Sequence, residues 1–114
     1  MPALDDYSHI SSYEDADGVL DGRSRKTIGN NTKLIKGESG TIYVRLHSTD
    51  VVVFNGDGTI NLYTGDYRSK TTKDRLNRYT PHGFDIVQRD KEWYVVRPDG
   101  TKERFREGHI IPEP

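Results

Sequence analysis

The sequence predicts a mainly β fold: an antiparallel meander of about six or seven strands, forming a small sheet or a partly open barrel, with one short helix. Three observations predict it. From residue 32 onward, short runs rich in β-branched and aromatic residues alternate with polar residues. Clusters of Gly, Asn, Asp and Pro separate these runs, as tight turns require. A convincing helix pattern occurs in one stretch, residues 71–79.

The clearest strand is residues 41–46, where Ile42, Val44 and Leu46 face one side and the residues between them face the other. The three valines at 51–53 are too β-branched and the run too short for a helix, which indicates a strand covered on both faces. The Asn-Gly-Asp-Gly sequence at 55–58 tolerates positive φ and closes a hairpin. The predicted strands are residues 41–46, 50–54, 59–63, 84–88, 92–96 and 101–105.

The predicted helix has start and stop signals. Thr71 is the expected N-cap, and Asp74 three residues later makes a variant of the capping box. Pro81 prevents the helix from continuing. Leu76 and Tyr79, three residues apart, are expected to dock the helix on the sheet.

At 114 residues the chain is expected to fold as one domain, because two halves would each have too small a core. Residues 1–22 contain six acidic residues, no basic residue and few aliphatic ones, which predicts a mobile acidic arm, with one helical turn as an option. Residues 23–111 are the expected β-rich domain and residues 112–114 a tail. All 17 Lys and Arg lie between residues 23 and 106, where they outnumber ten acids. This segregation favours an anionic partner or an arm that screens the body, although an ordinary solvated surface would also explain it.

Several classes of site are not indicated. The chain has no cysteine, so neither disulfides nor thiolate metal ligands are expected, and its four histidines are at least 27 residues apart. No glycine-rich phosphate loop, dinucleotide fingerprint or nucleophile elbow is present. No cofactor, metal or catalytic residue is therefore predicted, and a binding role is favoured over an enzymatic one. Apolar runs of the length that crosses a membrane, about 20 residues, are absent, so no membrane partner is expected.

The best candidate binding site is the basic stretch around the helix start. Lys and Arg side chains there lie beside free helix N–H groups and threonine hydroxyls, a combination that suits an anionic group, and two tyrosines are expected to stack a base. The predicted ligand-binding residues are Arg68, Lys70, Thr71, Thr72, Lys73, Arg75, Arg78, Tyr67 and Tyr79. The alternative is a short surface helix whose cations serve solubility.

A strand corner supplies the secondary candidates Arg45, His47 and Asp50. A histidine and an orienting carboxylate at such a corner would suit a small hydrolase. Capping of the turn by polar side chains is the alternative explanation.

Several stretches carry a resemblance to a known group of proteins: residues 25–32, residues 45–54 with the Asp-Gly-Thr-Ile sequence at 57–60, and residues 71–79. Over residues 23–97 the chain resembles small proteins encoded by tailed phages and related mobile elements. The resemblance implies a viral origin and a location in the cytoplasm of an infected bacterial host. It assigns no activity.

The leading hypothesis is a non-enzymatic phage accessory protein that binds nucleic acid or a nucleotide through the basic helix start. The alternative is a protein-binding inhibitor of a host or defence factor, in which the acidic arm mimics a nucleic-acid backbone or the last strand pairs with a partner edge. A hydrolase using His47 and Asp50 is a lesser alternative. A homo-oligomer formed through an edge strand is also open.

Overall fold

The computed structural model describes residues 10–65, 69–81 and 83–112. The elements in chain order are α1 (Tyr13–Leu20), β1 (Arg25–Gly29), β2 (Thr32–Lys36), β3 (Ile42–Leu46), β4 (Thr49–Phe54), β5 (Thr59–Leu62), α2 (Lys70–Tyr79), β6 (Asp85–Arg89), β7 (Glu92–Val96), β8 (Lys102–Arg104) and β9 (His109–Pro112). Neither helix is long and apolar enough to cross a membrane, among the residues described.

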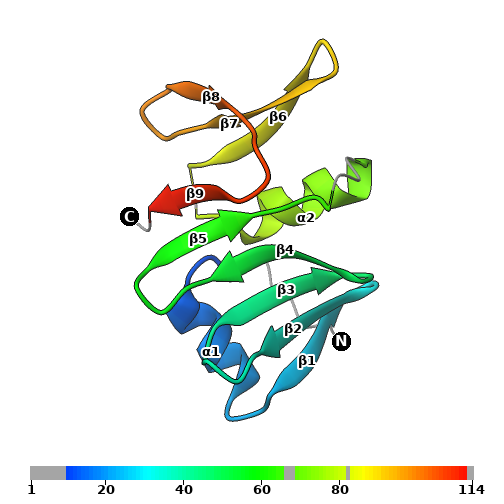
Figure 1. The fold of residues 1–114 in the computed structure, drawn as a ribbon, viewed down its shortest axis with the longest axis vertical. Coiled ribbons are helices and arrows are strands. Elements are labelled where there is room, and N and C mark those ends of the chain that lie inside the picture. Colours follow the sequence, from blue (N-terminus) through cyan, green and yellow to red (C-terminus); the bar gives the residue numbers. More distant parts are fainter. Residues whose placement is uncertain (1–9, 66–68, 82, 113–114) are drawn as a thin grey trace.

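The strands form two antiparallel sheets, as Figure 1 shows. One sheet has the order β1-β2-β3-β4-β5-β9 and the other the order β6-β7-β8. Strands β1 to β5 follow one another as a meander, and β9 returns from the end of the chain to pair with β5, placing Ile111 opposite Ile60. The expected mainly β, antiparallel fold is confirmed. The described residues hold nine strands and two helices, because the segment between β5 and β9 builds its own sheet and Pro112, expected in a tail, ends β9.

Similar five-residue turns join three of the hairpins, at residues 37–41, 55–59 and 97–101. In each, the first residue donates its N–H to the carbonyl of the last, and the fourth residue is a glycine with φ near +90°. Two of the turns add an aspartate: Asp57 and Asp99 each accept from the following threonine's N–H and hydroxyl, at 2.9 and 2.7 Å. The glycine is required because a side chain at this φ would be strained. The β3–β4 turn is tighter, with His47 in the left-handed region at φ 57°.

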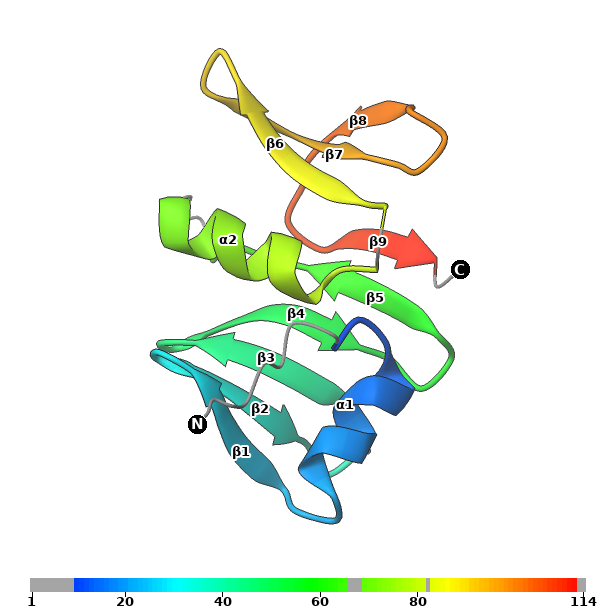
Figure 2. The same ribbon diagram turned by 180° about the vertical axis from the view of Figure 1, so that it is seen from behind.

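The inner face of the six-stranded sheet forms the main part of the core. Cross-strand pairing places Leu34, Val44, Val52 and Leu62 in one row across four strands, and none of the four is exposed. Both helices lie against this face (Figure 2). The outer face is not covered by any described helix.

Helix α1 corrects the expectation of a mobile arm for residues 10–22. Ser12 caps the helix by accepting from the N–H of Asp15 at 3.1 Å. Ile10, Ala16 and Leu20 are fully buried in the core. The expectation failed because composition averages over a segment, whereas three well-spaced apolar side chains are enough to dock two helical turns. Residues 1–9 lie outside the described part of the chain.

Helix α2 lies between the two sheets and contacts β4 in one and β6 in the other (Figure 1). Leu76 and Tyr79 are buried, as expected for the docking face. Asn77 joins the helix to the second sheet: its side chain accepts from the N–H of Ile86 at 2.7 Å and donates to the Ile86 carbonyl at 3.0 Å. These two hydrogen bonds anchor the second half of α2 to β6.

Candidate functional site

A pocket of about 390 Å³, here called the α2 pocket, lies where the β3–β4 turn meets the start of α2. Leu46 and Val51 supply apolar surface, and His47 lies at the turn. All other lining residues that the structure describes carry a hydroxyl group: Ser48, Thr49, Thr64, Ser69, Thr71 and Thr72. Hydroxyls donate as well as accept hydrogen bonds. No described lining residue is a carboxylate, but the Thr64 hydroxyl donates to the neighbouring carboxylate of Glu107. The remaining hydroxyls are compatible with an anionic group.

The helix start adds donors to this pocket. Ser69, rather than the expected Thr71, is the N-cap: its side chain accepts from the N–H of Thr72 at 3.1 Å and lies 3.0 Å from the Thr72 hydroxyl. The N-cap lies two residues before the predicted one, so Asp74, five residues after Ser69, is too far along to complete a capping box. The first intrahelical bond is donated by Lys73, which leaves the N–H groups of Lys70 and Thr71 without an intrahelical acceptor. Such groups attract negative charge.

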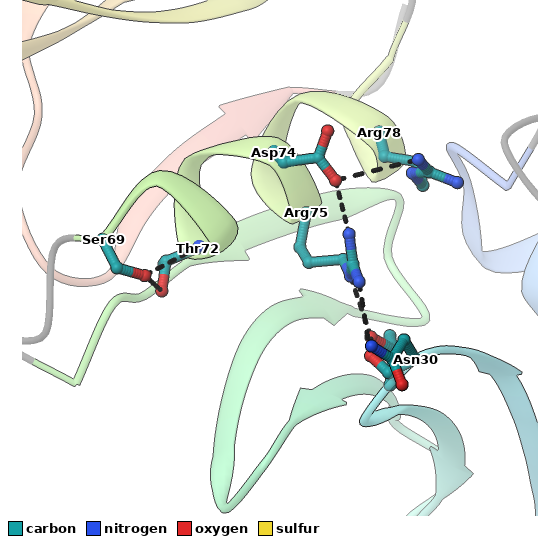
Figure 3. Close-up of polar contacts among 7 residues, drawn as sticks. Asn30, Ser69, Thr72, Asp74, Arg75 and Arg78 are labelled. Atoms are coloured by element: carbon teal, nitrogen blue, oxygen red, sulfur yellow. Dashed lines mark hydrogen bonds and ion pairs between the residues drawn. The ribbon is translucent and has the colours of Figure 1, made fainter.

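The predicted cations that the structure describes fall into two groups. Lys70 and Lys73, on the first turn of α2, form no ion pair with any described residue. Arg75 and Arg78 both pair with Asp74, the second at 3.7 Å (Figure 3). Of these four cations, the two arginines share the single carboxylate of Asp74, whereas the two lysines have no ion-pair partner among the described residues.

Arg75 also faces the protein rather than solvent. Its Nε donates to the hydroxyl of Thr32 at 2.9 Å, and its NH2 group donates to the carbonyl of Asn30 at 3.3 Å (Figure 3). Only 15% of the side chain is exposed. Arg75 thus belongs to a contact between α2 and the β1–β2 turn, and the sequence showed no sign of this because the partners are more than 40 residues away.

Of the two tyrosines expected to stack a base, Tyr79 is 1% exposed and belongs to the core, so that expectation is wrong for it. Its aromatic ring completes the buried face of α2. Tyr67 and Arg68 lie outside the described residues.

The secondary candidates do not form a catalytic pair. Arg45 donates to both carboxylate oxygens of Asp50, at 2.7 and 3.2 Å. This hydrogen bond raises the pKa of Arg45 above its ordinary value. No hydrogen bond joins Asp50 to His47 in the described part of the chain, and His47 lines the α2 pocket instead. The geometry that the hydrolase hypothesis requires is absent from these residues.

The sequence prediction missed Ser48, Thr49 and Thr64. Ser48 reaches the α2 pocket from the β3–β4 turn, Thr49 from the start of β4, and Thr64 from just beyond β5. A Ser-Thr pair after a turn normally indicates local capping, and only the placement of α2 beside the turn gives these hydroxyls a second role. Among the described residues, no group of three or more His, Asp or Glu side chains is placed to hold a metal ion.

Comparison with known proteins gives one family. The model of the Kyanoviridae Gp96 protein family matches residues 12–112, from the N-cap of α1 to the last residue of β9. No curated protein and no solved structure matches the chain. The match includes every helix and strand described above. It confirms that the chain is a small phage protein, as the resemblance implied. The chain therefore belongs to the Kyanoviridae Gp96 protein family, a family of phage proteins.

Proposed function

We propose that this protein is a non-enzymatic phage accessory protein that binds the phosphate group of a nucleotide or nucleic acid in the α2 pocket. The observation that supports the proposal is the coincidence, at one helix start, of a hydroxyl-lined pocket with two lysines that form no ion pair with any described residue. Each feature alone is common on protein surfaces. Together they supply the donors and the charge that a phosphate needs.

The hydroxyl groups of the lining supply hydrogen-bond donors for a bound phosphate. Thr71 is exposed, whereas the buried Thr72 hydroxyl lies 3.0 Å from the Ser69 hydroxyl, so Thr71 carries the accessible hydroxyl of the helix start. The N–H groups of Lys70 and Thr71 add backbone donors at the same end of the helix. Phosphate oxygens accept several hydrogen bonds at once, whereas a neutral ligand would leave the field of the helix N-terminus unused.

The two lysines on the first turn of α2 supply positive charge. Asp74, on the second turn of α2, forms ion pairs with Arg75 and Arg78. It therefore does not neutralise Lys70 or Lys73. The site is smaller than the sequence predicted, because it comprises the first turn of α2 and the β3–β4 turn rather than the whole helix.

The test is a fluorescence anisotropy titration with a labelled single-stranded oligothymidylate at several salt concentrations. The double variant Lys70→Gln/Lys73→Gln is expected to bind about tenfold more weakly, and the slope of log K against log salt should fall by about 0.7 for each phosphate that is no longer neutralised. The matched control is Lys33→Gln/Lys102→Gln, which removes the same charge from exposed positions on β2 and β8. Equal affinity in the two double variants, or no binding by the unmodified protein at low salt, would refute the proposal.

A second titration separates the pocket from general surface charge. Thr71→Val removes an exposed hydroxyl of the lining while keeping the side chain's shape and the charge of the protein. We expect weaker binding with an unchanged salt slope, since every ionic interaction with the phosphates is kept. Unchanged affinity in this variant would mean that the oligonucleotide binds outside the α2 pocket.

Deleting the acidic segment is not a useful test of the host-protein alternative. Deleting residues 1–22 would remove Ile10, Ala16 and Leu20 from the core and unfold the protein whatever its function. The variant Glu14→Gln/Asp21→Asn neutralises two exposed acids of this segment and leaves the core intact. Loss of a co-purifying host protein in this variant, with oligonucleotide binding unaffected, would favour the alternative.

A further inference from the structure

The outer face of the six-stranded sheet carries a shallow groove of about 640 Å³, here called the outer groove. Cross-strand pairing places Tyr43, Val53 and Asn61 in one row over β3, β4 and β5. Tyr63, directly after β5, lies on the same face two residues beyond Asn61. The groove is on the side of the sheet opposite the helices and is distinct in position from the α2 pocket, although Ser48 and Thr49 line both.

Two tyrosine rings flank this groove, and each rests on a glycine. A Cβ atom added to Gly37 would lie 3.1 Å from the Tyr43 ring, and one added to Gly108 would lie 3.4 Å from the Tyr63 ring. The Tyr43 ring therefore packs against the turn between β2 and β3, and the Tyr63 ring against the chain just before β9, while Val53 lies opposite Tyr43 on β4. Both tyrosines are half-buried, so each ring is held in place and keeps one part open to solvent. Rigid aromatic surfaces beside an apolar floor favour a flat ligand with an apolar face.

The open polar groups of the groove are neutral. The hydroxyls of Tyr43, Tyr63, Ser48 and Thr49 have no hydrogen-bond partner within the described part of the chain, and each of them can donate and accept. The Asn55 side chain donates from Nδ2 to Asn61 at 2.7 Å, which fixes both amides and leaves the side-chain Oδ1 of Asn55 available as an acceptor. These groups surround Val53 with hydrogen-bonding capacity and add no charge.

The charged residues of the lining do not favour anions. Of the described residues that line the groove, the only charged ones are Asp50 and Glu107, and none is a lysine, arginine or histidine. Asp50 is bound by Arg45, and Glu107 accepts from the backbone N–H groups of Thr64 and Gly65 at 2.7 and 3.0 Å. Because Arg45 is already paired with Asp50 and no described lining residue is a cation, the groove offers a phosphate or carboxylate ligand no free positive charge.

We infer that the outer groove is a binding site for a neutral saccharide. A pyranose ring has apolar C–H faces that pack on aromatic rings, and hydroxyls around its edge that both donate and accept hydrogen bonds. The two tyrosine rings match the faces, and the neutral hydroxyls and the side-chain Oδ1 of Asn55 match the edge. The groove is large enough for one or two sugar rings. This site does not depend on the phosphate site proposed above.

The experiment is a two-dimensional ¹H–¹⁵N NMR titration of the full chain with maltose, cellobiose and lactose, and separately with adenosine monophosphate. At least one disaccharide is expected to shift the amide signals of Tyr43, Val53 and Asn61, with a Kd on the order of 1 mM. Tyr43→Ala and Tyr63→Ala should each weaken binding about tenfold, because each removes one stacking surface. Tyr94→Ala is the matched control, since Tyr94 is equally half-buried but lies on β7 in the other sheet.

Tyr43→Phe and Tyr63→Phe keep the ring contacts with the glycines and remove only the hydroxyls. They therefore still test the site if an alanine variant fails to fold. Binding should fall less in these variants than in the alanine variants. The inference is overturned if none of the three disaccharides shifts the groove signals, if adenosine monophosphate shifts them at a lower concentration than any disaccharide, or if Tyr94→Ala weakens binding equally. The Lys70→Gln/Lys73→Gln variant should bind the disaccharide normally, which keeps failure of one site distinguishable from failure of the other.

Discussion

Replacing Arg75 with methionine tests whether this cation is structural or binds a ligand. The side chain is 15% exposed and donates to the Thr32 hydroxyl at 2.9 Å and the Asn30 carbonyl at 3.3 Å. Thr32 itself is fully buried. Methionine has a similar length and keeps the packing of the aliphatic stem, so the substitution removes mainly the polar contacts.

The expected loss of stability is about 2 kcal/mol. A hydrogen bond from a charged donor to a buried group contributes about 1.5–3 kcal/mol, which applies to the bond with Thr32. The longer bond to Asn30 adds little, because the same carbonyl also accepts from the Thr32 hydroxyl at 2.8 Å and stays paired. The ion pair with Asp74, whose carboxylate is 50% exposed, contributes less than about 1 kcal/mol.

Urea unfolding followed by circular dichroism measures this loss. With a slope of about 2 kcal/mol per molar urea for a domain of this size, the midpoint should fall by about 1 M. Arg78→Met is the control: its pair with Asp74 spans 3.7 Å between two half-exposed groups, and its removal should change stability by less than about 0.5 kcal/mol. Folded Arg75→Met should still bind the labelled oligothymidylate. An unchanged midpoint combined with abolished oligonucleotide binding would show that Arg75 faces the ligand, and the structural assignment would be wrong.

Two further predictions concern the core and a buried histidine. Leu20→Ala should lower stability by about 2–5 kcal/mol in the same urea assay, because Leu20 is fully buried where α1 meets the sheet; a change below about 0.5 kcal/mol would restore the mobile-arm interpretation. Burial lowers the pKa of His109 below its ordinary value of 6.5, an effect that nearby Glu103 opposes and Arg97 and Arg106 reinforce. The unfolded chain then binds the proton more readily than the folded one, so this contribution to stability is complete above pH 6.5 and is lost as the pH falls through the lower, folded pKa. The drop in melting temperature between neutral and mildly acidic pH should be smaller in His109→Gln, and an equal drop in both proteins would contradict it.

The local residue pattern was enough to predict the strands β3 to β5 and β6 to β8. Ile42, Val44 and Leu46 alternate with polar residues and are buried as that alternation predicts. The hairpin turns at 55–59 and 97–101 contain the residue types that their backbone angles demand. Helix α2 ends where Pro81 predicts, and its buried residues include the expected Leu76 and Tyr79.

The pattern was too weak to predict four other elements. Strands β1 and β2 bury Ile28 and Leu34 among several lysines and arginines, so few positions carry a hydrophobic period. The short β9 becomes a strand because β5 offers it a free edge almost 50 residues earlier in the chain. Helix α1 is stabilised by the sheet it covers, since an isolated helix of eight residues is marginal in water.

The candidate site, like the fold, was predictable in part from local sequence and in part only from the tertiary structure. The sequence by itself determined that the chain is β-rich and antiparallel, where its sharpest turns lie, and that hydroxyls and lysines gather at the start of one helix. Only the tertiary structure decided that Arg75 and Tyr79 turn inward, that the β3–β4 turn supplies the other wall of the α2 pocket, and that one face of the large sheet stays open. The physical reason is the separation along the chain of the residues that interact. Turns and periodicity depend on neighbours in the chain, whereas burial, ion pairing and pocket formation depend on segments tens of residues apart.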